Sequence, residues 1–351
     1  MQALSEKEWD ERTIEELFLV GAGKRLTNAD KIDGNKPFIG ATDNNNGVTG
    51  FVGNDNPSRD KNVLGVNYNG APCIAFYHPY ECVFTDDVKR LHLRHHADGE
   101  SVLLFFKTIV MQQRSKYSYG YKFKEKRMLR QKLMLPVTAA GEPDYDYMEN
   151  YILHTGGGML MRYKNYIAEQ LSQLEYKEIP ALNEKEWKDI EIGTIADVNS
   201  GRDIYAQERT EGNTPYITSG TSNNGIGYFV GNDNDSKARN AISVNRNGAV
   251  GEAFYHPYNA LYGNDCRRVN IRAVQDAYTQ LFIAKCISMQ KEAFSYSRKL
   301  GTARLKRLHI MLPVTDSGEP DYDYMAQYTK NMMLRKYEQY LAFIGSKQRE
   351  K

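Results

Sequence analysis

The chain has 351 residues, of which 41% are hydrophobic and 26% are charged, a globular composition that excludes a disordered chain. Its formal net charge is only +2, so binding to an acidic polymer would depend on local basic patches. The polar N-terminus does not resemble a signal peptide, and no apolar run approaches the roughly 18 residues of a membrane span. We therefore expect a cytoplasmic protein without membrane attachment. The 4 cysteines lack C-x-x-C spacing, which predicts reduced thiols and no metal site.

An internal repeat is the most informative feature of the sequence. Residues 7–9 (Lys-Glu-Trp) recur at 185–187, and residues 75–80 (Ala-Phe-Tyr-His-Pro-Tyr) recur at 253–258. Leu-Pro-Val-Thr and Pro-Asp-Tyr-Asp-Tyr-Met also occur once in each half. Each copy is long enough to form a domain with its own core. We predict one domain over residues 1–142 with a tail over 143–180, and a second over 181–318 with a tail over 319–351.

Each copy begins with short strand-like segments separated by Gly and Asn turns, and a helical pattern follows. This order predicts a mixed α+β domain, with a curved β-sheet and small helices, in both copies. The predicted strands are 37–40, 50–52 and 63–66 in the first copy, and 215–217, 227–230 and 241–244 in the second. The helical patterns carry apolar residues at Leu103, Phe106 and Val110, and at Tyr278, Leu281, Phe282, Cys286 and Met289.

Both tails begin at a Glu-Pro-Asp sequence, where proline suits the first turn of a helix. Apolar residues then recur every three or four positions, which predicts one apolar stripe on each helix. Glycines 156–158 occur only in the first tail and cost about 1 kcal/mol each relative to alanine in a helix. They predict a break, with one helix over 145–154 and another over 159–175. The stripes comprise Leu160, Tyr163, Ile167, Leu171 and Leu174 in the first tail, and Leu334, Tyr337, Leu341 and Ile344 in the second.

Two amphipathic helices in one chain would bury their stripes by packing on each other. Antiparallel packing predicts a molecule with approximate two-fold symmetry, in which the helices hold the two domains apart. Helices of roughly 17 to 30 residues span about 25 to 45 Å, comparable with the roughly 34 Å of one DNA turn. The alternative is that each helix only caps its own domain.

A basic stretch precedes each Leu-Pro-Val-Thr sequence, over residues 114–132 in the first copy and 291–307 in the second. Aromatic residues are interleaved with the lysines and arginines, among them Tyr117, Tyr121 and Phe123. This composition suits phosphate contacts combined with contacts to bases or sugars. A solvated basic surface is the alternative, but occurrence at the same place in both copies argues against it.

Loops rich in asparagine and glycine form a second candidate for nucleic-acid contact. They lie at 42–47 and 67–70, and again at 222–225 and 245–248. Asparagine can pair with adenine and arginine with guanine, although Asn and Gly are also the usual residues of tight turns. Tyr68 corresponds to Arg246, a difference that would let two similar domains read different sequences. The DNA-binding candidates are Lys24, Arg25, Asn44, Asn45, Tyr68, Asn69, Lys116, Tyr119, Lys122, Lys124 and Arg127, and Arg202, Asn223, Asn224, Arg246, Asn247, Tyr296, Arg298, Lys299 and Arg304.

Taken together, these motifs resemble the DNA-specificity (S) subunits of Type I restriction-modification systems and their compact Type IIB relatives. The resemblance covers essentially the whole chain. It implies two target-recognition domains that each read half of a split DNA sequence, joined by antiparallel spacer helices. It also implies a non-catalytic subunit that assembles with DNA adenine methyltransferase (modification) subunits, fused to or joined by a restriction subunit. S-adenosylmethionine would bind to the methyltransferase and no cofactor to this chain.

Motifs for chemistry on this chain are weak. The amino-methyltransferase sequences Asn-Pro-Pro-Tyr and Asp-Pro-Pro-Tyr do not occur. Residues 21–24 (Gly-Ala-Gly-Lys) lack the first glycine and the Ser or Thr of a phosphate-binding loop. Two other functions remain open. Pro143-Asp144 with Glu175 and Lys177 could form a metal-dependent nuclease pattern, although the second copy lacks the Glu-x-Lys part. A tandem module that binds something other than DNA, such as a glycan, is the other alternative.

Overall fold

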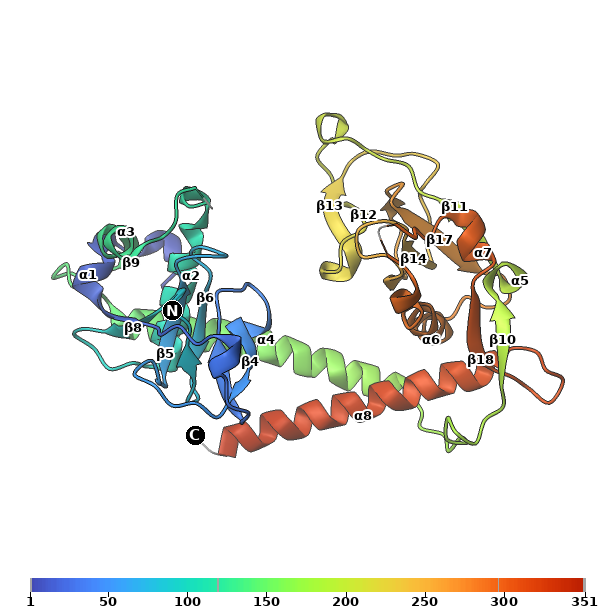
Figure 1. The fold of residues 1–351 in the computed structure, drawn as a ribbon, viewed down its shortest axis with the longest axis horizontal. Helices are drawn as coiled ribbons and strands as arrows, with labels where there is room; N and C mark the ends of the chain where they lie inside the picture. Colours follow the sequence, from blue (N-terminus) through green and yellow to red (C-terminus); the bar gives the residue numbers. More distant parts are fainter. Residues whose placement is uncertain (1, 119, 296, 350–351) are drawn as a thin grey trace. The chain divides into compact units, whose positions relative to one another are not determined.

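The computed structural model describes residues 2–118, 120–295 and 297–349. The chain divides into two compact units, Met1–Tyr163 (unit 1) and Lys164–Lys351 (unit 2). The same order of strands and helices occurs in both units (Figure 1). The predicted α+β class, with two similar domains, is confirmed.

The described residues of unit 1 form three antiparallel or mixed sheets. The four-stranded sheet has the order β2-β8-β5-β6, the three-stranded sheet the order β4-β3-β7, and β1 pairs with β9. All these pairings are antiparallel except β3 with β7, which is parallel. The elements are β1 (Trp9–Thr13), α1 (Ile14–Leu17), β2 (Phe18–Ala22), β3 (Lys36–Ile39), β4 (Val48–Val52), β5 (Val63–Asn67), β6 (Ala75–His78), β7 (Val83–Phe84), β8 (Val88–Leu93), α2 (Glu100–Gln112), α3 (Glu125–Arg130), β9 (Lys132–Pro136) and α4 (Tyr145–Gln173).

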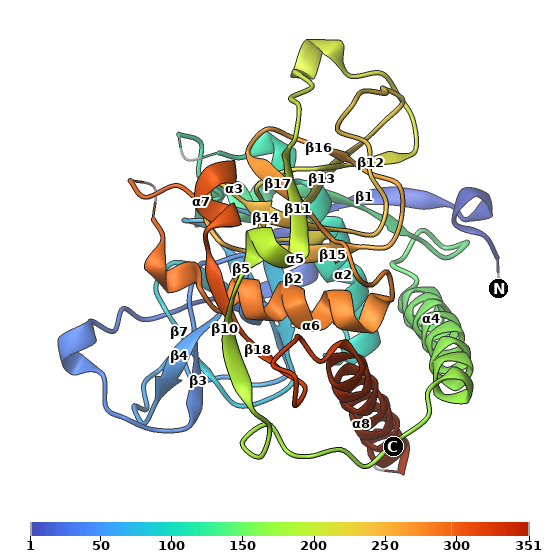
Figure 2. The same cartoon turned by 90° about the vertical axis from the view of Figure 1, so that its right-hand side faces the viewer.

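Unit 2 repeats this topology with the orders β11-β17-β14-β15 and β13-β12-β16, and with β10 paired to β18. In Figure 2, α6 lies across the four-stranded sheet of this unit. The elements are β10 (Trp187–Glu191), α5 (Ile192–Ile195), β11 (Ala196–Ser200), β12 (Thr214–Ile217), β13 (Ile226–Val230), β14 (Ala241–Asn245), β15 (Ala253–His256), β16 (Leu261–Tyr262), β17 (Cys266–Ile271), α6 (Ala277–Ser288), α7 (Thr302–Lys306), β18 (His309–Pro313) and α8 (Tyr322–Arg349).

One of the two inner strands of each four-stranded sheet, β5 in unit 1 and β14 in unit 2, is buried along its whole length. Side chains alternate between the two faces of a strand, so each face needs its own apolar partner. In β5, Leu64 and Val66 join the core that includes α2, whereas Val63 joins a smaller core with Phe84 of the three-stranded sheet. The four-stranded sheet therefore lies between a helix and a second sheet, which explains why β5 is almost entirely apolar.

The first and last strands of each unit lie side by side. Trp9 in β1 is opposite Pro136 in β9, and Trp187 in β10 is opposite Pro313 in β18. The loops that precede the long helices therefore begin close to the start of the same unit.

The predicted break at glycines 156–158 is wrong, because α4 runs as a single helix of 29 residues. A Cβ atom at any of the three glycines would meet nothing within 4 Å, so the glycines remove no packing contact. Their cost is the backbone entropy of about 1 kcal/mol each, and helical hydrogen bonds on both sides offset it.

Within unit 2, the end of α4 and the segment after it run antiparallel to α8. The rings of Tyr166 and Tyr337 meet edge to face at 6.4 Å between centroids. Farther along the chain, Nε2 of Gln327 donates to the carbonyl oxygen of Glu175 at 2.8 Å. Residue 166 thus contacts residue 337, whereas residue 175 contacts residue 327. The two segments therefore run in opposite directions. Of the predicted stripe residues, Ile167, Leu174, Leu334 and Ile344 are buried, Leu160, Leu171, Tyr337 and Leu341 are half-buried, and Tyr163 is exposed.

Candidate nucleic-acid interface

Two loops of unit 1, over residues 41–47 and 67–70, contact each other at the end of β5. Nδ2 of Asn67 donates to the carbonyl oxygen of Thr42 at 2.9 Å. Gly70 has a φ of +59°, and a Cβ atom there would lie 2.5 Å from the carbonyl oxygen of Ala41. A glycine is therefore required where the two loops touch. Unit 2 repeats the link, because Nδ2 of Asn245 donates to the carbonyl oxygen of Gly220 at 3.2 Å.

The asparagine-rich turns have a structural explanation of their own. Asn45 and Asn46 have φ values of 49° and 51°, and Asn223 and Asn224 both have 52°. Asparagine tolerates this left-handed region better than other residues with a side chain. The turn thus accounts for these residue types, while their side chains stay exposed. Contact with DNA by Asn45 and Asn223 stays a prediction.

The basic stretch of unit 1 lies against these loops. Arg114 is 3.7 Å from the carboxylate of Asp43 in the asparagine-rich loop. Farther along, the guanidinium of Arg127 lies 3.9 Å from the ring centroid of Tyr121 and donates to the carbonyl oxygen of Lys122 at 2.9 Å. These contacts orient Arg127, which is exposed.

In unit 2, Arg304 donates to the carbonyl oxygen of Lys299, the counterpart of the contact made by Arg127. Arg298 lies over the ring of Phe294 at 5.8 Å, and Lys291 pairs with Glu252 at 2.8 Å. Both units therefore place an exposed arginine, held by a nearby backbone carbonyl, at the same point of the basic stretch.

The aromatic residues of the stretch divide between core and surface. Phe123 is fully buried and Tyr117 packs against the same core, where its hydroxyl donates to Oε1 of Gln131 at 2.7 Å. Tyr121, by contrast, is half exposed. The expected contact of the interleaved aromatic residues with bases or sugars therefore does not extend to Phe123. Tyr119 and Tyr296 lie outside the described residues.

The other predicted DNA-binding residues lie at or near the surface. Tyr68 and Asn69 are held in place, since Nζ of Lys89 lies 5.6 Å from the Tyr68 ring and Nδ2 of Asn69 donates to Asp87 at 2.9 Å. The exposed residues are Lys24, Arg25, Asn44, Asn45, Lys116, Lys124, Arg127, Arg202, Asn223, Asn224, Arg298 and Arg304, and the half-buried ones are Tyr68, Asn69, Lys122, Arg246, Asn247 and Lys299.

A pair of basic residues beneath these loops was missed in the sequence. Lys89 in β8 is 8% exposed and pairs with Glu125 at 2.6 Å. Its counterpart in β17 is Arg267, which is 5% exposed. Two consecutive basic residues at matching positions of two strands, Lys89-Arg90 and Arg267-Arg268, were the signal that could have identified them.

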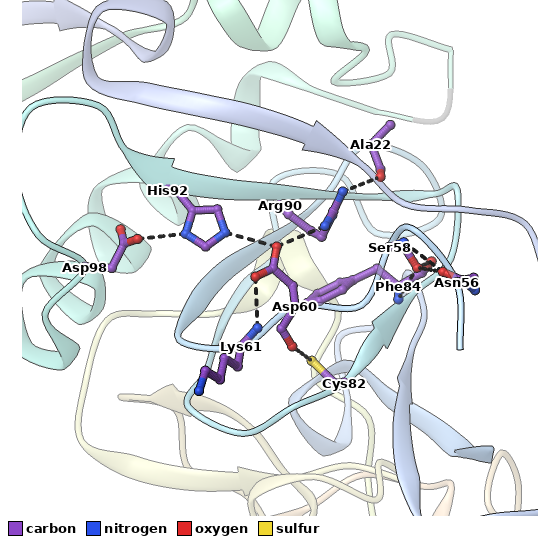
Figure 3. A network of polar contacts seen from close by, with 10 residues as sticks. All are labelled: Ala22, Asn56, Ser58, Asp60, Lys61, Cys82, Phe84, Arg90, His92 and Asp98. Carbon is purple, nitrogen blue, oxygen red and sulfur yellow. Dashed lines mark hydrogen bonds and ion pairs between the residues drawn. The ribbon is translucent and has the colours of Figure 1, made fainter. Parts of the chain in front are cut away.

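A polar network lies on the four-stranded sheet of unit 1 (Figure 3). Asp60 accepts from Arg90 and lies 3.0 Å from Nε2 of His92, whose Nδ1 lies 2.7 Å from Asp98. Burial opposes protonation of His92, but its hydrogen bonds to the two carboxylates outweigh burial and raise its pKa. The network joins β8 to the loops that precede β5 and α2, and we interpret it as structural.

The carboxylate of the candidate nuclease pattern has another role. Asp144 pairs with Lys7 at 2.7 Å and accepts from the backbone N–H of Tyr147 at 2.9 Å. Asp321 pairs with Lys185 at the same distance, so the arrangement recurs where no Glu-x-Lys follows. These contacts explain the repeated Pro-Asp as the start of a long helix. Among the described residues, no group of three or more His, Cys, Asp or Glu side chains could hold a metal ion.

The chain matches a known family over most of its length. The profile of the family described as "Type I restriction modification DNA specificity domain" matches residues 6–156 and 184–340. The chain belongs to this family. The two matches fall one in each copy of the repeat, which confirms the resemblance inferred from the sequence. Among the described residues of this family member, no helix is long and apolar enough to cross a membrane.

A curated relative is the specificity subunit S.BcgI of a Type II restriction enzyme from Heyndrickxia coagulans, 50% identical over 153 residues. That match spans 44% of this chain and 45% of the relative. The crystal structure of the S subunit of a Type I restriction-modification system from M. genitalium is similar in fold, with a TM-score of 0.50 at 15% identity. That similarity covers 99% of this chain and 94% of the solved one.

Proposed function

We propose that the chain is the DNA specificity subunit of a restriction-modification complex. Unit 1 and unit 2 each read one half of a bipartite double-stranded target. Partner subunits then methylate adenine N6, with S-adenosylmethionine bound to the methyltransferase, and carry out restriction. The chain itself selects the site and does no chemistry, and its DNA substrate implies a cytoplasmic location.

The observation that carries this proposal is the repetition of one surface in both units. Arg127 and Arg304 are exposed, and each is oriented by a backbone carbonyl five residues earlier. In the same basic stretch of unit 1, Arg114 lies 3.7 Å from Asp43, which precedes a turn whose asparagines have a positive φ. Exposed guanidinium groups of fixed orientation suit the phosphate backbone, which has the same chemistry at every sequence. Two such surfaces in one chain suit a target with two separated halves.

The deciding experiment maps methyladenine by long-read sequencing in cells that express the chain together with its partner methyltransferase. A methylated motif with two fixed halves and an unspecified gap should appear only when both proteins are present. A motif that persists when this chain is omitted would contradict the proposal. Cleavage of a plasmid by the purified chain with Mg²⁺ alone would instead favour the nuclease alternative.

A binding measurement tests the phosphate role of the two arginines. Arg127→Ala and Arg304→Ala should each weaken binding to all duplexes about equally, and each should reduce the slope of log K against log salt by about 1. Lys188→Ala, an exposed position in the two-stranded β10-β18 sheet, serves as the control and should leave the slope unchanged. Loss of binding to one sequence only would show that the arginine reads bases.

A further inference from the structure

The two units serve as a comparison for each other, because their basic residues fall into two classes. One class is the same in both units, with Lys122 matching Lys299 and Arg127 matching Arg304. The other class differs, and Tyr68 of unit 1 is replaced by Arg246 in unit 2. Phosphates are identical at every DNA sequence, whereas base edges are not. Residues that read bases are therefore expected in the class that differs.

In unit 1 the differing positions are balanced in charge. Lys89 pairs with Glu125 of α3 at 2.6 Å, and its ammonium group also lies 5.6 Å from the ring centroid of Tyr68. The positive charge beneath the loop is thus neutralised by a carboxylate within the protein.

In unit 2 the same place holds two guanidinium groups. Nη1 of Arg246 and Nη1 of Arg267 both donate to the carbonyl oxygen of Asn264, at 3.4 and 2.7 Å. Thr302 occupies the position of Glu125, so the carboxylate of unit 1 is absent. In the part of the chain that the structure describes, neither arginine forms an ion pair with a carboxylate. Burial, followed by the proximity of Arg246, lowers the pKa of Arg267, while Cys266 and Asp265 oppose this shift. Nη1 of Arg267 also donates to the carbonyl oxygen of Cys266 at 3.1 Å.

Two like charges beside one carbonyl oxygen are unfavourable unless further acceptors approach them. Arg246 is half-buried and lies on the loop that follows β14, whereas Arg267 is 5% exposed. A ligand that supplies hydrogen-bond acceptors can therefore reach Arg246. The positive charge of Arg267 would strengthen its binding. The major-groove edge of guanine offers two acceptors, O6 and N7, spaced for an arginine fork.

We propose that Arg246 reads a guanine in the half-site of unit 2 and that Arg267 is its positioning residue. This inference rests on the proposed function, because it assigns one base contact within the DNA target. Unit 1 carries Tyr68 at the same position and does not read guanine there. The two half-sites consequently differ at the equivalent base pair.

The test uses the full chain and a pool of double-stranded oligonucleotides with randomised positions, selected by binding and then sequenced. The unmodified chain should enrich two half-sites separated by an unselected gap. Arg246→Gln should reduce the preference for guanine at one position by roughly 5- to 150-fold and leave the other half-site unchanged. Arg246→Lys keeps the charge without the fork, and should also lose most of the preference at that position.

Arg267→Gln should weaken the guanine preference at the same position as Arg246→Gln, and the double variant should lose little more than Arg246→Gln alone. A general loss of stability would not change one base position selectively. Lys306→Gln in α7 is the control and should weaken binding to every sequence without altering either half-site.

Three results would overturn the inference: an unchanged motif in Arg246→Gln and Arg246→Lys, a lost preference for a base other than guanine, or an equal loss at all sequences, which would make Arg246 a phosphate contact. Failure of the unmodified chain to enrich any split motif would overturn the proposed function as well. The two failures are therefore distinguishable.

Discussion

The hydroxyl of Ser243 lies 2.8 Å from Nε2 of His256, and both residues are completely buried in unit 2. The corresponding residues of unit 1 are Gly65 and His78. Nε2 of His78 is buried without a hydrogen-bond partner among the described residues, because glycine supplies no hydroxyl. The buried histidine is thus present in both units, but its Nε2 has a hydrogen-bond partner only in unit 2, among the described residues.

Ser243→Ala should lower the free energy of unfolding of unit 2 by about 1 to 3 kcal/mol, because it leaves a buried ring nitrogen without its partner. Each unit contains one of the protein's 2 tryptophans, so each can be followed separately by fluorescence. Denaturant unfolding followed by Trp187, in a Trp9→Phe background, measures the effect. The reciprocal background, with Trp187→Phe, should show unit 1 unchanged. Equal losses in both units would contradict the assignment.

The buried histidines predict a loss of stability in acid. Burial lowers the pKa of both His78 and His256 to about 4, from an ordinary value of 6.5. Between these values the unfolded chain binds a proton that the folded chain does not, so stability falls as the pH drops from 6.5 toward 4. The loss should be roughly 2 to 4 kcal/mol per histidine. In His78→Asn, the free energy of unfolding of unit 1 should depend less steeply on pH across this range. That of unit 2 should keep its pH dependence.

His92 should act in the opposite direction and in a different range. Its raised pKa comes from hydrogen bonds to Asp60 and Asp98 that outweigh burial. The stabilisation is complete below the ordinary value of 6.5 and is lost as the pH rises through the raised pKa. Unit 2 has Asn270 and Ala238 at the positions of His92 and Asp60, and should lack this dependence. Unfolding of each unit from pH 6 to 9, with His92→Asn as the second comparison, tests the prediction; an identical slope in both units would refute it.

Replacing the three glycines of α4 by alanine should stabilise the protein. An added Cβ meets nothing at positions 156–158, so each change gains helix propensity without a clash, at roughly 0.5 to 1 kcal/mol. Gly70→Ala is the matched control and should destabilise unit 1, since φ is +59° and the Cβ would meet a backbone oxygen. Helical circular dichroism and the denaturation midpoint measure both variants. A lower midpoint for the α4 variant would contradict the prediction.

The repeat, the α+β class and the family could be predicted from sequence because they depend on motifs that occur twice. The fate of glycines 156–158 could not, because a local propensity of about 1 kcal/mol per residue competes with a helix that extends on both sides. The alternation of aromatic and basic residues likewise did not predict that Phe123 is buried. Its burial depends on packing in the core of unit 1.

The charge difference between Lys89 in unit 1 and Arg267 in unit 2 depends on a long-range contact that local patterns do not contain. Lys89 and Glu125 are 36 residues apart in the chain. The sequence alone does not reveal this contact. It therefore does not reveal that Arg267 lacks the equivalent carboxylate, since Thr302 stands at the position of Glu125.

The pairing of the first strand with the last, in β1-β9 and again in β10-β18, bears on how new specificities arise. A genetic crossover within the repeated Leu-Pro-Val-Thr and Pro-Asp-Tyr-Asp-Tyr-Met segments would join whole modules and leave no sheet with a missing edge. If each unit reads a half-site, as we propose, existing units can then be recombined into a larger repertoire of targets without the evolution of a new fold.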